Sequence, residues 1–98
     1  MERNFTYDLF DLDSYSCYDR LVTDLVDSLL EGKLNVHYLF SKYYTRVIRD
    51  AIKKLANICS ENQEDKYKAK VALKKIEGNL SLNTKYRSWA RSGLNDAS

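Results

Sequence analysis

Apolar residues recur every three or four positions over long stretches of this sequence, and this periodicity constrains the fold more than any other feature. A helix gathers such positions on one side, whereas a strand divides them between its two faces. The 98 residues include no proline that would interrupt a helix. The first stretch predicts a helix over residues 14–31, with Asp13, Ser14 or Ser16 as its N-cap. Its apolar positions are Tyr18, Leu21, Val22, Leu25, Val26, Leu29 and Leu30.

Three further helices are predicted over residues 36–59, 64–77 and 84–91. Asn35 is a suitable N-cap for the second of them, which is the longest and forms the spine of the predicted fold. Residues 92–98 are expected to form a frayed tail. The apolar stripe of the second helix includes Tyr43, Tyr44, Val47, Ile48 and Ile52, and the last three are expected at the centre of the core.

Each of the three glycines, Gly32, Gly78 and Gly93, follows a stretch with helical periodicity. Glycine suits the residue after a helix because it adopts the left-handed conformation without a steric cost. Residues 1–13 mix acidic and aromatic side chains and are expected to form an arm that packs on the helices, since a lone strand would have no partner. The sequence therefore predicts an all-α protein: a compact bundle of three to four helices with an acidic-aromatic N-terminal arm, in one domain over residues 1–98.

Charge is divided unevenly along the chain. Residues 1–32 carry eight acidic and two basic side chains, a net charge of −6, whereas residues 33–98 carry fourteen basic and six acidic ones, a net charge of +8. A surface of one sign attracts a partner of the opposite sign over roughly 8–10 Å at moderate salt. The division favours a protein that works by interaction.

The leading hypothesis is a non-enzymatic binding protein that acts by stoichiometric contact with a protein or nucleoprotein that handles nucleic acid. Basic residues spaced four, three and four positions apart on the second predicted helix would form one contact face. The acidic-aromatic arm would form another by inserting aromatic side chains into a basic groove of the partner. The expected contact residues are Lys42, Arg46, Arg49, Lys53, Asp8, Phe10 and Asp11.

The alternative hypothesis is direct binding of nucleic acid by the basic C-terminal half. Residues 85–91 interleave aromatic and basic side chains, which suits base stacking beside phosphate contacts. The competing interpretations are a solvated basic face, a tryptophan that closes the core, and a homo-oligomer in which acidic and basic halves of neighbouring copies pair. The residues expected to bind nucleic acid are Lys70, Lys74, Lys85, Arg87, Trp89 and Arg91.

The sequence contains no catalytic, metal-binding or cofactor-binding motif, so neither an enzyme nor a cofactor is expected. His37 is the only histidine. Cys17 and Cys59 are expected to be buried free thiols, and the residues that flank them resemble no known nucleophile motif. Asp24 and Asp27 are interpreted as solvated helix-surface acids and not as a magnesium site. The isolated glycines form no phosphate-binding loop.

The chain has no apolar run near 18 residues and no signal-peptide pattern after Met1. These features predict a cytoplasmic protein with no membrane contact. In size and make-up the chain resembles the small single-domain inhibitors that phages encode against host nucleic-acid machinery. That resemblance covers no motif, and it implies a protein that blocks its partner by occupying a surface.

Overall fold

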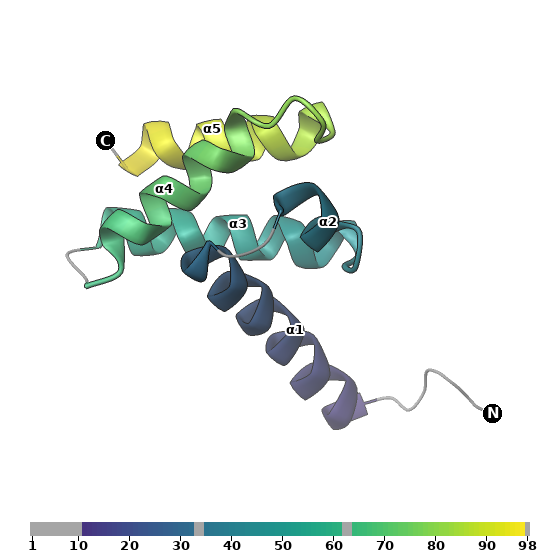
Figure 1. The fold of residues 1–98 in the computed structure, drawn as a ribbon. Helices are drawn as coiled ribbons and strands as arrows, with labels where there is room; N and C mark the ends of the chain where they lie inside the picture. The colour runs from purple at the N-terminus through teal and green to yellow at the C-terminus, as the bar shows by residue number, and fades with distance from the viewer. Residues whose placement is uncertain (1–10, 33–34, 62–63, 98) are drawn as a thin grey trace.

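The computed structural model describes residues 11–32, 35–61 and 64–97, and within them the chain is an all-α compact bundle, as predicted. Figure 1 shows its helices, and the described residues contain no strand. The helices are α1 (Asp11–Glu31), α2 (Val36–Phe40), α3 (Thr45–Ser60), α4 (Lys66–Glu77) and α5 (Thr84–Ala97).

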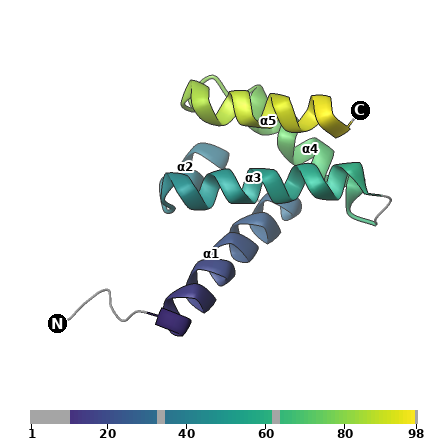
Figure 2. The same ribbon diagram turned by 180° about the vertical axis from the view of Figure 1, so that it is seen from behind.

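The central helix is α3, which packs against α1, α4 and α5. Figure 2 shows α5 along one side of α3 and α1 leaving from the other side. The helices α3 and α5 run in the same direction, because Tyr86 and Thr45 at their first turns share a hydrogen bond of 3.1 Å and Gly93 lies against Ala56 further along both. The N-terminal half of α1 projects away from the bundle (Figure 1).

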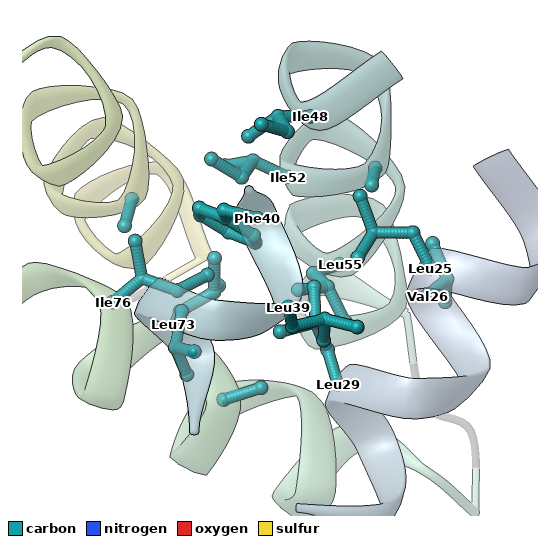
Figure 3. Packing of buried hydrophobic residues seen from close by; sticks show 14 of the residues in the cluster. Leu25, Val26, Leu29, Leu39, Phe40, Ile48, Ile52, Leu55, Leu73 and Ile76 are labelled. Carbon is teal, nitrogen blue, oxygen red and sulfur yellow. The ribbon is translucent and has the colours of Figure 1, made fainter. Parts of the chain in front are cut away.

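The core is built from the apolar faces of α1, α3 and α4 with a contribution from α2 (Figure 3). Ile48 is fully buried, and Val47 and Ile52 beside it are almost so, which confirms their predicted place at the centre. Each large apolar side chain buried in this way stabilises the fold by about 1.5–3 kcal/mol. The most completely buried large side chains include Leu25, Ile48, Ile52, Leu55, Leu73 and Ile76.

The caps of α2 and α5 follow the sequence. The side chain of Asn35 accepts a hydrogen bond of 3.0 Å from the backbone N–H of Tyr38, as predicted. The side chain of Asn83 accepts one of 2.8 Å from the N–H of Lys85 at the start of α5. Each bond satisfies a backbone donor that has no partner within its helix.

The prediction of one continuous helix over residues 36–59 is wrong, because α2 ends at Phe40 and α3 begins at Thr45. The hydroxyl of Ser41 donates to the carbonyl of Tyr38 at 2.6 Å, and the N–H of Tyr43 bonds the carbonyl three residues before it at 3.2 Å. A serine hydroxyl offers the backbone an alternative to the helical ladder. These local bonds tighten the chain into a turn and end the helix.

Tyr44 follows this turn with an extended backbone, at φ −71° and ψ 153°. Its side chain is 81% exposed, although the predicted apolar stripe placed it on the buried side. Lys42 lies in the turn and is therefore not on the same helix as the basic residues that follow it.

The predicted ends of the first and last helices also need correction. Helix α1 begins at Asp11, so residues 11–13 belong to a helix and not to an arm, and residues 1–10 of the predicted arm lie outside the described residues. Helix α5 continues to Ala97 instead of ending at residue 91. Gly93 therefore lies inside α5. A β-carbon at this position would come within 2.9 Å of the β-carbon of Ala56, so glycine allows α3 and α5 to approach each other.

Gly32 alone has the left-handed backbone expected after a helix, with φ of 69°. Gly78 ends α4 with a right-handed backbone, at φ −85° and ψ −2°. The nitrogen Nζ of Lys75 lies beside Gly32, 3.2 Å from where a β-carbon would be. A cation at this place stabilises α1 by interacting with the partial negative charge of its C-terminal end, since the last turn carries no basic residue of its own.

Candidate functional site

The helix α5 separates its basic residues onto two edges. Residues four positions apart lie on the same edge of a helix, which joins Lys85 with Trp89 and Arg87 with Arg91. The ammonium of Lys85 lies 6.0 Å from the centre of the Trp89 ring. The sequence-predicted nucleic-acid residues on α5 are therefore split between two surfaces and do not form one site.

Arg87 and Arg91 are both engaged by the last residue of α4. The Nε–H of Arg87 donates to the backbone carbonyl of Glu77 at 2.9 Å, and Nε of Arg91 forms an ion pair with its carboxylate, also at 2.9 Å. The first bond satisfies a helix C-terminal carbonyl and the second neutralises the glutamate. Both arginines thus fasten α5 to α4.

The other edge of α5 faces α3 across a hollow of about 340 Å³, which we call the α3–α5 groove. Trp89 forms part of its wall and is half-buried, with its ring centre 5.8 Å from that of Tyr86. Trp89 therefore both borders the core and presents a surface to solvent. The groove is lined by Arg49, Ile52, Lys53, Ala56, Trp89, Ser92, Gly93 and Asp96.

Three of the four residues in the predicted basic ridge lie on α3: Arg46, Arg49 and Lys53 are exposed and occupy one face of this helix. We call these three the α3 basic ridge. Lys42 is separated from them by the turn, and its ammonium lies 4.6 Å from the ring centre of Tyr38. The structure thus brings Arg49 and Lys53 together with Trp89, a combination that the sequence analysis assigned to two different hypotheses.

Asp50, the acidic residue beside the α3 basic ridge, interacts with side chains of both α1 and α3. Asp50 accepts a hydrogen bond from the Tyr18 hydroxyl, which fastens α1 to α3, and its carboxylate lies 3.4 Å from Nε of Arg49. The hydrogen bond from Tyr18, helped by the charges of Arg49 and Lys53, lowers the pKa of Asp50 against the opposing effect of burial. Burial, with the bond to Asp50 and its charge, raises the pKa of Tyr18 to about 12. At neutral pH Asp50 is ionised and Tyr18 is not.

A second hollow lies between α1 and the start of α3, with a volume of about 520 Å³; we call it the α1–α3 hollow. Its lining is mostly apolar and includes the exposed side chains of Leu21 and Tyr44. The hollow could not be predicted from the sequence, because the apolar spacing places Tyr44 on the buried side of one continuous helix. The lining residues are Cys17, Tyr18, Leu21, Tyr44, Arg46 and Val47.

Three lysines of α4 form a separate basic surface. Lys66, Lys70 and Lys74 are exposed, and among the described residues none of the three forms an ion pair within 4.0 Å. Glu77 continues the line of Lys70 and Lys74 along the helix, so these lysines lie on the edge of α4 that leads to Arg91. This edge is distinct from the α3–α5 groove.

The remaining sequence-predicted residues are distributed as follows. Asp8 and Phe10 lie outside the described residues, and Asp11 is the first residue of α1. Both cysteines are free thiols, but the expectation that both are buried is wrong for Cys17, which is exposed on the projecting part of α1. Burial raises the pKa of the Cys59 thiol, whose Sγ lies 3.8 Å from the carbonyl of Lys66.

No cluster of three or more histidine, cysteine or acidic side chains suited to a metal ion occurs within the part of the chain that the structure describes. Asp24 and Asp27 are exposed on α1, and His37 is exposed on α2. None of the helices described is both long enough and apolar enough to cross a bilayer.

Comparisons of the chain with protein-family models, with curated proteins and with solved structures found no match. The class that the fold defines is therefore an all-α helical bundle, and its function has to be argued from its surfaces.

Proposed function

We propose that this chain is a small non-enzymatic binding protein, which acts by stoichiometric contact with a protein or nucleoprotein that handles nucleic acid. Its contact site is the α3–α5 groove together with the α3 basic ridge. The observation that carries the proposal is that two cationic side chains of α3, Arg49 and Lys53, line an apolar groove that has the half-buried Trp89 of α5 in its wall.

The groove combines the two properties on which protein partners depend. A tryptophan that becomes fully buried on binding is a frequent source of affinity, and the apolar surface of Ile52 and Ala56 beside it adds contact area. Arg49 and Lys53 give the α3 side of this surface a positive charge, and Lys85 lies 6.0 Å from the centre of the Trp89 ring, so the cations steer an acidic partner. The groove thus suits an acidic protein segment that carries an apolar anchor.

Occupation of a partner's surface is sufficient for inhibition, and it needs no catalytic group. The chain resembles in size and make-up the small inhibitors that phages encode against host nucleic-acid machinery, so inhibition is the form of the function that we propose. Charge complementarity with a surface of the partner would raise the rate of association.

The test is a tagged pull-down from source or host lysate after nuclease treatment, compared between the parent chain and the variant Arg49→Glu/Lys53→Glu. The parent is expected to retain a protein partner, and the variant to lose it. The matched control is Lys66→Glu/Lys70→Glu, which changes the net charge equally on α4 and is expected to retain the partner. Loss of the partner in both variants, or in neither, would contradict the groove as the contact site.

A second candidate function is direct binding of nucleic acid, and the unpaired lysines of α4 favour it. Lys66, Lys70 and Lys74 recur every fourth residue, which separates them by about 6 Å along the helix. Arg87 and Arg91 are less available than these lysines for phosphate contacts, because Glu77 binds the side chains of both. The row is therefore smaller than the set that the sequence suggested.

Fluorescence anisotropy with a labelled DNA duplex distinguishes this candidate from the first. Direct binding predicts that the logarithm of the association constant falls linearly with that of the salt concentration, with a slope of about −0.9 per phosphate neutralised. Lys70→Glu/Lys74→Glu should abolish it, whereas Arg49→Glu/Lys53→Glu should preserve most of it. Absence of binding at low salt would remove this candidate and leave the protein partner.

A further inference from the structure

Two exposed tyrosines, Tyr38 and Tyr44, flank the turn between α2 and α3. Tyr38 is 54% exposed and Tyr44 is 81% exposed, so each ring keeps a surface on which another planar group can stack. Neither ring lines the α3–α5 groove. Large aromatic side chains that stay exposed on one surface are typical of a place where a partner binds.

The turn holds the two rings in place at one end of the bundle. The hydroxyl of Ser41 donates to the carbonyl of Tyr38 at 2.6 Å, which keeps the chain between the two tyrosines compact. Helix α2 is anchored from its other side by Phe40, whose ring packs edge-on against Tyr86 of α5 with 5.4 Å between the ring centres. Figure 1 shows α2 beside the first turns of α3 and α5.

The two stretches that form this end of the bundle carry positive charge only. Residues 35–48 and 78–90 contain four basic residues and no acidic one. Lys42 is the nearest of these cations to a tyrosine, with its ammonium 4.6 Å from the ring centre of Tyr38. The first turns of α3 and α5 lie side by side and add their partial positive charges. This end of the bundle therefore attracts a polyanion.

Among polyanions, a single-stranded nucleic acid matches both properties of this surface. Its phosphates meet the positive charge, and its unpaired bases offer planar faces that stack on aromatic rings whatever their sequence. In a duplex the same faces are already stacked on neighbouring bases. An acidic peptide offers the charge but has no planar group at each position of its chain.

We propose that the turn between α2 and α3 binds single-stranded nucleic acid, with bases stacked on the rings of Tyr38 and Tyr44 and the phosphate chain beside Lys42. This site is separate from the α3–α5 groove and from the lysines of α4. It gives the chain a nucleic-acid contact of its own beside the contact proposed for a protein partner.

Fluorescence anisotropy of a labelled oligodeoxythymidine, titrated with the full-length protein at low salt, tests the proposal. A strand of equal length that lacks bases has the same charge and serves as the comparison. The variants are Tyr38→Ala/Tyr44→Ala, which removes both rings, and Tyr38→Phe/Tyr44→Phe, which keeps them. The matched control is Tyr67→Ala, which removes a tyrosine that is 76% exposed on α4.

We expect the parent to bind the oligodeoxythymidine more tightly than the strand without bases. Tyr38→Ala/Tyr44→Ala should lower the affinity by about fivefold or more for each ring, because the stacked bases lose their contact. The phenylalanine variant and Tyr67→Ala should keep the parent affinity, and far-ultraviolet circular dichroism confirms that each variant retains its helices. Equal affinity for the two strands, or an unchanged affinity in the alanine variant, would overturn the proposal.

Two further variants separate this site from the lysines of α4. Lys42→Gln should reduce the salt slope for the single strand by about 0.7, the value for one phosphate contact. Lys70→Glu/Lys74→Glu should still prefer the oligodeoxythymidine to the strand without bases, since stacking takes place elsewhere. Loss of that preference would place the strand on α4 and would overturn the proposed site.

Discussion

The hydroxyl of Tyr18 donates a hydrogen bond to the carboxylate of Asp50, and this bond joins the projecting helix α1 to the central helix α3. The same hydroxyl lies 3.3 Å from the backbone carbonyl of Arg46. Asp50 stays ionised and also forms an ion pair of 3.4 Å with Arg49, so it offsets part of the positive charge of the α3 basic ridge. The bond from Tyr18 therefore connects the stability of the fold with the charge of the proposed contact site.

Replacement of Tyr18 by phenylalanine removes this hydrogen bond and keeps the ring. We expect the free energy of unfolding to fall by about 1 kcal/mol, since the bond involves a charged acceptor but is partly open to water. Urea denaturation followed by circular dichroism measures the change. Asp50→Asn in the Tyr18→Phe background should add less than it costs alone, and full additivity of the two losses would show that the residues do not interact.

The ionisation of Tyr18 predicts a loss of stability in alkali. Its pKa rises from 10.0 to about 12 in the folded chain, so folding favours the protonated phenol. The resulting stabilisation is fully present below pH 10 and is lost as the pH rises from 10 to about 12. Urea denaturation across this interval should show a steeper decline for the parent than for Tyr18→Phe. The comparison with Tyr18→Phe isolates the contribution of the Tyr18 hydroxyl.

The lowered pKa of Asp50 predicts that the stability of the fold also falls in acid. Its pKa is lowered from 3.8 in the folded chain, so folding favours the carboxylate. This stabilisation is present above pH 3.8 and is lost as the pH falls through the lowered value. The difference in stability between the parent and Asp50→Asn should therefore shrink below pH 3.8, and a constant difference down to lower pH would contradict the assignment.

The close approach of α3 and α5 at Gly93 predicts that even one added methyl group disturbs their contact. In Gly93→Ala the new β-carbon would lie 2.9 Å from that of Ala56, so the helices must separate. We expect a loss of about 1–3 kcal/mol despite the better helix propensity of alanine. Thermal denaturation measures it.

The compensating variant Ala56→Gly removes the opposing methyl group. In the double variant Gly93→Ala/Ala56→Gly the steric part of the loss should disappear, apart from the propensity cost of the new glycine. A Gly93→Ala protein that is more stable than the parent would show that the helices adjust without strain.

Ile48 tests the centre of the core. Ile48→Ala removes a fully buried side chain, and we expect the free energy of unfolding to fall by about 2–5 kcal/mol. Ile48→Val, which removes one methylene group, should cost about 0.5–1.5 kcal/mol. Chemical denaturation of both variants gives the two values, and a loss below about 0.5 kcal/mol for the alanine variant would exclude Ile48 from the core.

The apolar periodicity was sufficient to predict the core and the helical class. Val47, Ile48 and Ile52 are buried because burial follows the spacing of apolar residues along a helix, which the sequence displays directly. Tyr44 fitted the same spacing and is exposed, because a local hydrogen bond from Ser41 contributes to the end of α2. Periodicity alone does not reveal a competition between a side-chain hydroxyl and the helical ladder.

The candidate site was predicted only in part. The common face of Arg46, Arg49 and Lys53 follows from their spacing. The grouping of Lys85 with Arg87 in one nucleic-acid site is wrong, because the helical period of α5 places these two residues on different edges. The approach of Trp89 to the basic ridge depends on the packing of α5 against α3, which rests on the contact of Gly93 with Ala56. Glycine is typical of the residue after a helix, so the sequence alone does not reveal that Gly93 lies inside α5 and makes this contact.

The parallel direction of α3 and α5 gives the groove between them an electrical polarity. The first turns of the two helices lie side by side, where Thr45 and Tyr86 share a hydrogen bond, and neither has an acidic residue in its first turn. Their partial positive charges therefore add at that end, beside Lys85, whereas Asp96 lines the groove near the other end. The positive field along the groove therefore weakens from the first turns of the two helices toward Asp96. A segment in the proposed site would lie with its more acidic end beside those first turns, so the groove favours one of the two directions of a bound chain.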